Sequence, residues 1–124
     1  MRGTTSLNSK AVAAAIIIVI AVIATVGVYF HDNPSGVTSI ADINDGKVAV
    51  GENVTIKGRI LLVFVLLMGP NEQFPTIGDG QHNITFAWFN SYVHVGWVII
   101  ASGTVETNRS LSHVQWLEQV WLFG

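Results

Sequence analysis

Residues 11–30 read AVAAAIIIVIAVIATVGVYF, twenty consecutive residues without a charge. A helix rises about 1.5 Å per residue, so this run would extend over roughly 30 Å, the thickness of the hydrocarbon core of a bilayer. A soluble domain has no use for an apolar surface of that length on every face. The stretch therefore predicts a membrane-spanning helix. It divides the chain into residues 1–10, the helix at 11–30, a linker at 31–44 and a domain at 45–124.

The two sides of this helix differ in charge. Arg2 and Lys10 precede it, and no Lys or Arg follows it until Lys47. Because basic flanks tend to stay on the cytoplasmic side, we expect a single-pass protein of the cell membrane. Its N-terminus would be cytoplasmic and its C-terminal domain extracytoplasmic. A cleaved secretory signal is the alternative, although the apolar run is long for a signal and ends in Val-Tyr-Phe, a poor cleavage site.

Three N-x-S/T sequons follow the helix and agree with an exterior domain. The glycosylation candidates are Asn53, Asn83 and Asn108. Asn53 and Asn83 border expected strands, so they can equally be turn residues.

All eight carboxylates follow the helix, whereas only four of the six basic residues do, so the chain after the helix carries a net charge of −4. Proteins that bind nucleic acid draw most of their affinity from Lys and Arg that neutralise phosphates. We therefore expect no nucleic acid among the partners. The chain has no cysteine, which excludes disulfides and thiolate chemistry.

Beyond the linker, the period of the apolar residues changes to two. Val54, Ile56 and Ile60 alternate with polar residues, which is typical of a half-buried strand. Gly58 within this strand predicts a bulge or a sharp bend. Before the strand, Thr38 or Ser39 starts a short helical turn. Four more strands are expected, at residues 73–77, 82–89, 96–106 and 111–123, and the register of the last one stays open.

Several motifs of this domain resemble those of the OB-fold. They are G-x-x-V-x-I-x-G-x-I at 51–60, F-x-x-I-x-D-G at 74–80, I-x-F at 84–86 and G-W-V-I-I-A-S-G-T-V at 96–105. The resemblance covers roughly residues 43–123. An OB-fold usually has a helix between strands three and four, for which residues 90–94 are too short. The expected fold class is an N-terminal transmembrane α-helix followed by an all-β, five-stranded OB-type barrel.

The layout of a membrane helix with an outward-facing OB domain is similar to that of the haem chaperones of cytochrome c maturation. In that family the haem-attaching histidine follows the last strand in an H-x-x-x-Y context. His113 is the histidine nearest to that position, and it has no tyrosine four residues on. The resemblance therefore implies the layout and not the haem site.

The histidines could ligate a metal, since neutral imidazole is a common ligand. They are dispersed and lack H-x-H or H-x₃-H spacing, so we expect structural or surface histidines and no cofactor. The candidates for a metal site are His82, His94 and His113. Asp79, between two glycines, could be a base or a ligand, but its position favours a turn in which its side chain binds backbone amides.

Aromatic residues are frequent in the domain, and rings of this kind stack bases on OB surfaces. They are Phe86, Trp88, Phe89, Tyr92, Trp97, Trp116 and Trp121. Only Lys57 and Arg59 accompany them, so core packing or a protein interface is favoured.

Residues 60–68 read ILLVFVLLM, which is too apolar for a strand with one buried face and too short to span a bilayer. We expect one side of this segment to contact a membrane partner, and a fully internal strand is the alternative. The expected interface residues are Ile60, Leu62, Phe64, Leu66 and Met68.

The sequence contains no nucleophile–base pair, phosphate-binding glycine loop, H-E-x-x-H motif or paired carboxylates. We therefore predict a non-enzymatic accessory or assembly subunit of a larger membrane complex, with membrane lipid and other membrane-protein subunits as partners. Three alternatives stay open. They are a haem or metal carrier of the cytochrome c maturation type, an oligonucleotide-binding OB module, and a filament subunit similar to archaeal pilins.

Overall fold

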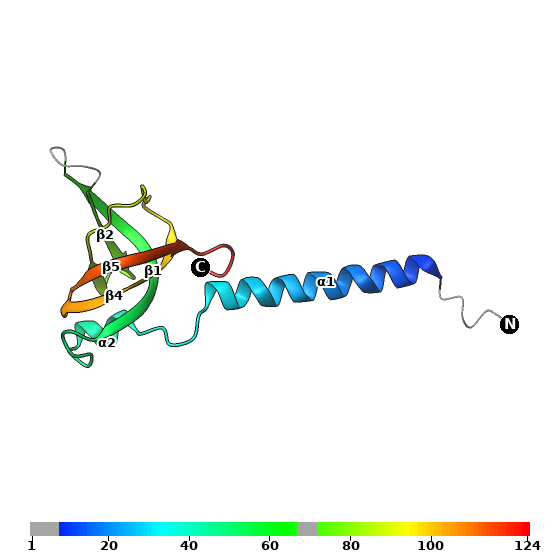
Figure 1. Ribbon diagram of the computed structural model, residues 1–124, viewed down its shortest axis with the longest axis horizontal. Coiled ribbons are helices and arrows are strands. Elements are labelled where there is room, and N and C mark those ends of the chain that lie inside the picture. The colour runs from blue at the N-terminus through cyan, green and yellow to red at the C-terminus, as the bar shows by residue number, and fades with distance from the viewer. Residues whose placement is uncertain (1–7, 67–71) are drawn as a thin grey trace.

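The computed structural model describes residues 8–66 and 72–124. Its longest element is helix α1 (Ser9–Asp32), which extends away from a small barrel (Figure 1). The side chains of α1 are exposed along almost the whole helix. Among the described residues, α1 is the one helix that is long and apolar enough to cross a membrane. The helix predicted from residues 11–30 is therefore present.

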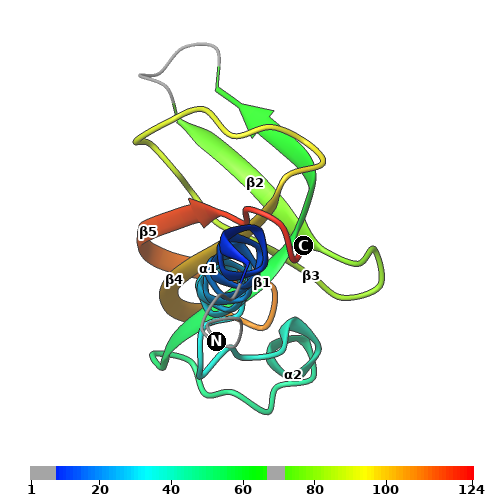
Figure 2. The same ribbon diagram turned by 90° about the vertical axis from the view of Figure 1, so that its right-hand side faces the viewer.

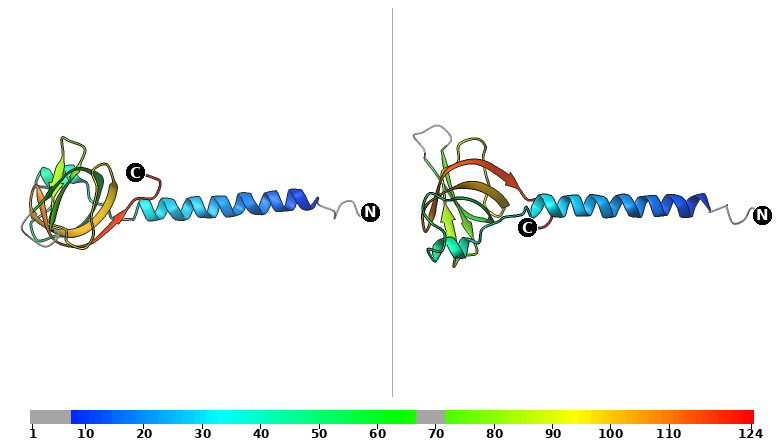
Figure 3. Two further views of the ribbon diagram at one scale, coloured as in Figure 1. Left: turned by 90° about the horizontal axis from the view of Figure 1, so that it is seen from above. Right: turned by 60° about the horizontal axis from the view of Figure 1, so that its bottom comes forward.

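Five strands close the barrel in the order β1-β2-β3-β5-β4. Neighbouring strands are antiparallel except β3 and β5, which pair in parallel through Thr85 and Ser110. The strands are β1 (Asn53–Val65), β2 (Gln73–Gly78), β3 (Asn83–Thr85), β4 (Val98–Thr107) and β5 (Ser110–Gln119). This closed arrangement, seen from two further sides in Figure 3, confirms the expected five-stranded barrel.

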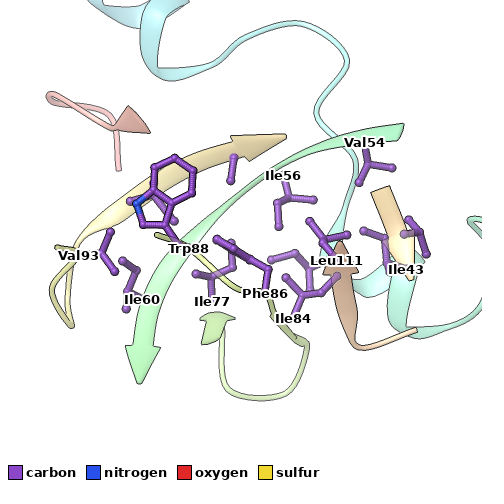
Figure 4. Packing of buried hydrophobic residues seen from close by; sticks show 14 residues of the cluster. Ile43, Val54, Ile56, Ile60, Ile77, Ile84, Phe86, Trp88, Val93 and Leu111 are labelled. Atoms are coloured by element: carbon purple, nitrogen blue, oxygen red, sulfur yellow. The ribbon is translucent and has the colours of Figure 1, made fainter. Parts of the chain in front are cut away.

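A short helix, α2 (Ile40–Asn44), precedes β1 and packs against β3 at one end of the barrel (Figures 1 and 2). Ile40 and Ile43 are buried in the same cluster as strand residues such as Ile56 and Ile84 (Figure 4). Residues 86–97, all of them described, form no helix. Apolar residues of α2 therefore cover part of the core in a chain that lacks a helix between β3 and β4.

Gly58 permits a close approach inside the barrel. A Cβ at this position would lie 3.2 Å from Ile40 Cδ1 and 3.3 Å from the backbone nitrogen of Gly78. The shift in the register of β1 occurs later, between Ile60 and Leu62. The predicted irregularity is therefore present, but it follows the glycine and does not coincide with it.

The apolar segment that begins at Ile60 is neither fully internal nor exposed throughout. Ile60 itself is fully buried, which removes it from the expected interface residues, because it packs inside the barrel. Leu62, Phe64 and Leu66 are exposed, and their role in an interface stays a prediction. Met68 lies outside the described residues.

Candidate functional site

A groove with a volume of about 420 Å³ opens beside β2, β3 and β5. Strand β3 has only three residues and pairs with β5 at a single position, so the two strands have little backbone pairing there. The side chains that matter for its chemistry are Phe74, Phe89, Ser110, Ser112 and His113. We call it the β2–β3 groove.

Phenylalanine rings form the apolar part of the β2–β3 groove. Phe89 is 54% exposed, and Phe86 is buried in the core. Phe74 is half-buried and contacts the exposed ring of Phe64, with centroids 6.4 Å apart and planes inclined by 49°. A planar apolar ligand can therefore stack on Phe89 or against the Phe64–Phe74 pair.

Gln73 fixes the segment that carries Phe89. Its backbone pairs with that of Trp88 in both directions, at 3.0 and 2.8 Å. Its side chain is buried, donates to the carbonyl of Ser91 at 2.7 Å and accepts the N–H of Val93 at 2.9 Å. Gln73 is not among the candidates taken from the sequence. The alternation of β2 could have indicated it, because Gln73 lies four residues before the inward-facing Ile77 and therefore faces the core as well.

A bulge in β5 places His113 at the groove. Three residues of β5, 113–115, lie opposite Gly103 alone. His113 has a φ of 53°, in the left-handed region that few residues other than glycine adopt, although histidine is among the more tolerant. A Cβ on Gly103 would lie 2.6 Å from Val114 Cγ2, so only glycine fits beneath this bulge. His113 also borders a second recess, of about 360 Å³, beside Trp116.

The charged residue in the lining of the groove is Glu106, whereas Arg109 lies outside the lining, in the exposed turn between β4 and β5. Two carboxylates away from the groove have partners of their own. Asp32 accepts three backbone N–H groups, and Glu118 lies 2.5 Å from His31 Nε2. Among the residues that line the groove, Glu106 is a carboxylate and none is a lysine or arginine, so a bound phosphate would have to be neutralised from outside the lining.

Asp79 occupies the turn between β2 and β3, in agreement with its position in the sequence. Its Oδ1 accepts the N–H groups of His82 at 2.7 Å and Gln81 at 2.9 Å. These bonds, first that of His82 and then that of Gln81, hold the pKa of the Asp79 carboxyl below its ordinary value. Its role in the structure is to close the turn.

The structure does not bring the three metal candidates together. His82 Nδ1 lies 3.5 Å from Asp79 Oδ2, the ring of His94 lies 4.8 Å from that of Trp97, and His113 contacts Ser112. Within residues 8–66 and 72–124, no group of three His, Asp or Glu side chains could hold a metal ion.

The three sequons lie at strand ends and turns. Asn53 begins β1 and Asn108 lies between β4 and β5. Asn83 begins β3, and its side chain bonds both the N–H and the carbonyl of Gly80, at 3.0 and 3.2 Å. The turn thus uses the atoms of Asn83 to which a glycan would attach, and glycosylation at all three sites stays a prediction.

The sequence matches no protein-family model and no curated protein. Solved structures, in contrast, share the fold. The Stn1–Ten1 complex of S. pombe aligns at 12% identity and a TM-score of 0.55, over 74% of this chain and 82% of that one. The barrel is OB-like. The telomere capping protein Ten1 from Schizosaccharomyces pombe aligns at 12% identity and a TM-score of 0.50, over 68% of this chain and 79% of its own.

An aspartyl tRNA synthetase from Entamoeba histolytica aligns at 14% identity and a TM-score of 0.54. The alignment covers 70% of this chain and 22% of the synthetase. At such identities, these likenesses show the OB-like fold. They give no support to the resemblance to haem chaperones.

The comparisons correct two predictions. The expected accessory subunit of a membrane complex and the expected absence of nucleic acid among the partners are both wrong, because the OB-like neighbours are named as telomere capping and tRNA synthetase proteins. The prediction rested on net charge alone, which does not show where on the surface each charge lies; Asp32 and Asp79, for example, lie outside the β2–β3 groove.

Proposed function

We propose that this chain binds a single-stranded oligonucleotide in the β2–β3 groove, without catalysis. The observation that carries this proposal is the position of the exposed Phe89 ring and the half-buried Phe74 ring in a groove beside β2 and β3. That face and its neighbouring loops are where OB-folds bind oligonucleotides. The neighbours named for telomere capping and for tRNA add support.

Stacking supplies the larger part of the proposed affinity. Base–aromatic stacking contributes about 1–3 kcal/mol per base, and any base has a face that can stack. Ser110, Ser112 and His113 line the same groove. The Ser110 hydroxyl bonds that of Thr107 at 2.8 Å and the Ser112 hydroxyl bonds His113 Nδ1 at 3.1 Å, so a base edge would share or replace these bonds. Arg109 at the neighbouring turn would contact a phosphate. Because cations are few, affinity should fall only gently as salt rises.

We also propose that α1 crosses a membrane, so that the barrel is held at a bilayer surface. The length and composition of α1 support this, as does the exposure of its side chains. The cations Arg2 and Lys10 before the helix favour a cytoplasmic N-terminus. An extracytoplasmic barrel is then expected, and protease digestion of intact cells tests it, since a cytoplasmic barrel would stay undigested.

Fluorescence anisotropy with the full chain in mild detergent tests the binding proposal. Labelled single strands on the order of ten nucleotides are compared with a duplex of the same sequence. Phe89→Ala should weaken single-strand binding roughly 5- to 150-fold, the loss of one stacked base. Trp116→Ala is the matched control, because this ring borders the second recess outside the groove. Absence of single-strand binding at low salt, or equal losses in both variants, would refute the proposal.

The salt dependence gives a second test. Arg109→Gln should make the slope of log affinity against log salt shallower by about 0.7, the value for one phosphate contact on a single strand. Arg59→Gln is the control, since Arg59 lies on β1 and does not line the groove. Identical slopes in the two variants would exclude Arg109 from the interface.

A further inference from the structure

The end of α1 is fastened to the last residues of the chain. The buried carboxylate of Asp32 accepts the backbone N–H groups of residues 121–123 at 2.7–2.8 Å. Such bonds are stronger than those between neutral groups. Lys57 Nζ donates to the carbonyl of Phe123 at 2.5 Å and to Asn33 Oδ1 at 3.0 Å. The C-terminal segment therefore lies beside the end of α1 (Figure 1).

His31 adds a second set of contacts at this junction. Its Nδ1 lies 2.6 Å from Asp32 Oδ1, and its Nε2 lies 2.5 Å from Glu118 Oε1 of β5. The indole of Trp121 stacks on the His31 ring, with centroids 3.4 Å apart and planes inclined by 10°. The end of α1 is thus bonded both to strand β5, through Glu118, and to the segment that follows it, through residues 121–123.

Apolar side chains face outward around this bonded centre. Trp121 is 64% exposed and Leu122 is 68% exposed, and Tyr29 and Phe30 at the end of α1 are also exposed. We call these four residues the junction cluster. The polar side chains beneath it bond one another, so the cluster offers mainly apolar surface with the polar tips of Trp and Tyr. Tryptophan and tyrosine are enriched where a bilayer meets water.

We infer that the junction cluster lies in the interfacial layer of a bilayer, with lipid as its partner. This inference rests on the proposed membrane crossing by α1. If residues 11–30 fill the hydrocarbon core, the cluster falls at the edge of that core. Lipid fits because the cluster continues the exposed apolar surface of α1, and because His31, Asp32 and Glu118 follow it directly on the water side. The side of the barrel that carries the junction cluster then faces the membrane.

Fluorescence quenching in phosphatidylcholine vesicles with brominated acyl chains tests this with the full chain. Bromines near the headgroup should quench part of the tryptophan emission, and Trp121→Phe should lose most of that quenching. Trp116→Phe, an exposed ring on the barrel wall, is the matched control and should keep it. If Trp121→Phe is quenched like the wild type while the chain resists carbonate extraction, the inference is overturned and the crossing stands. Release by carbonate would overturn the crossing as well.

A second measurement uses the absence of cysteine from the chain. Leu122→Cys and Glu52→Cys each carry one NBD fluorophore, the latter on an exposed turn of the barrel. Aqueous dithionite added to the vesicles should bleach the label at position 52 several-fold faster than the label at position 122, counting only the outward-facing molecules. Equal rates would contradict the burial of the cluster in lipid.

Discussion

The junction cluster and the β2–β3 groove both expose aromatic rings, but they differ in the polar groups beside those rings. At the junction, Asp32 and His31 are bonded within the protein, and Trp121 covers them from outside. In the groove, the Ser112 and His113 side chains bond each other at 3.1 Å, but the His113 ring is exposed and shares the lining with the exposed Phe89 ring. The comparison teaches that exposed rings alone do not identify a partner. The neighbouring polar groups separate a surface suited to lipid from one suited to a nucleic-acid base.

Among the substitutions considered, Asp32→Asn should produce the largest effect, because it weakens the hydrogen bonds at the junction. Both carboxylate oxygens accept N–H groups, and an amide retains only one acceptor. The variant therefore places an amide NH₂ against at least one of the three N–H groups of residues 121–123 and removes the charge from the remaining bonds, so the barrel should melt on the order of 10 °C lower. Thermal scans by circular dichroism in detergent measure this shift.

The control for this variant is Asp42→Asn, whose carboxylate is exposed and lies 3.8 Å from Lys47. It should change the melting temperature little. Below the melting temperature, single-strand affinity should be similar in both variants, because the groove and the junction share no lining residue. A melting temperature unchanged by Asp32→Asn would mean that the junction does not stabilise the barrel.

Gln73→Leu breaks the groove side, with a smaller effect. It leaves the buried N–H of Val93 and the carbonyl of Ser91 without their partner. The free energy of unfolding should fall by about 1 kcal/mol, the low end of the cost of an unpaired buried polar group, as measured by urea denaturation. Because the segment with Phe89 loosens, single-strand affinity should fall as well, while the shallow quenching of Trp121 in vesicles stays.

Gln119→Leu is the matched control, since Gln119 is exposed at the end of β5. It should alter neither stability nor affinity by much. If Gln73→Leu lowered stability without lowering affinity, the segment that follows β3 would not belong to the binding face, and the site would have to be placed closer to β5.

Periodicity predicted the parts of the fold that depend on near neighbours in sequence. The long helix follows from an uninterrupted apolar run, and the strands follow from alternation. The register of the last strand stayed open because the bulge at residues 113–115 changes which face each side chain occupies. Residues 121–123 were expected to continue that strand, but they leave it to bind Asp32.

The parts of the site that could not be predicted depend on distant partners. Asp32 lies in a stretch that reads as a linker, and its partners are 89–91 residues away. Gln73 looks like an ordinary polar residue at a strand end until its bonds to residues 91 and 93 are known. Net charge failed for a related reason, because a sum over the chain does not show where on the folded surface each charge lies.

Asp79 lies outside both the junction cluster and the lining of the groove. Its substitution should have the smallest effect on stability. Because backbone N–H groups of His82 and Gln81 hold the pKa of this carboxyl below its ordinary value of 3.8, the folded state binds the proton less readily than the unfolded state. The stabilisation is therefore fully present above the unfolded pKa and is lost as pH falls through the lower folded pKa. Asp79→Asn keeps an acceptor oxygen but removes the charge, so it isolates this contribution.

The stability difference between wild type and Asp79→Asn should be small and constant between about pH 5 and pH 7, and should shrink towards about pH 3. Urea denaturation across this range measures it. In the same range, the difference caused by Gln73→Leu should not depend on pH, because no group in the bonds of Gln73 titrates there. A difference for Asp79→Asn that grew on acidification would contradict the sign of the pKa shift. It would mean that the turn between β2 and β3 favours the protonated carboxyl, and that its hydrogen bonds do not set the local stability.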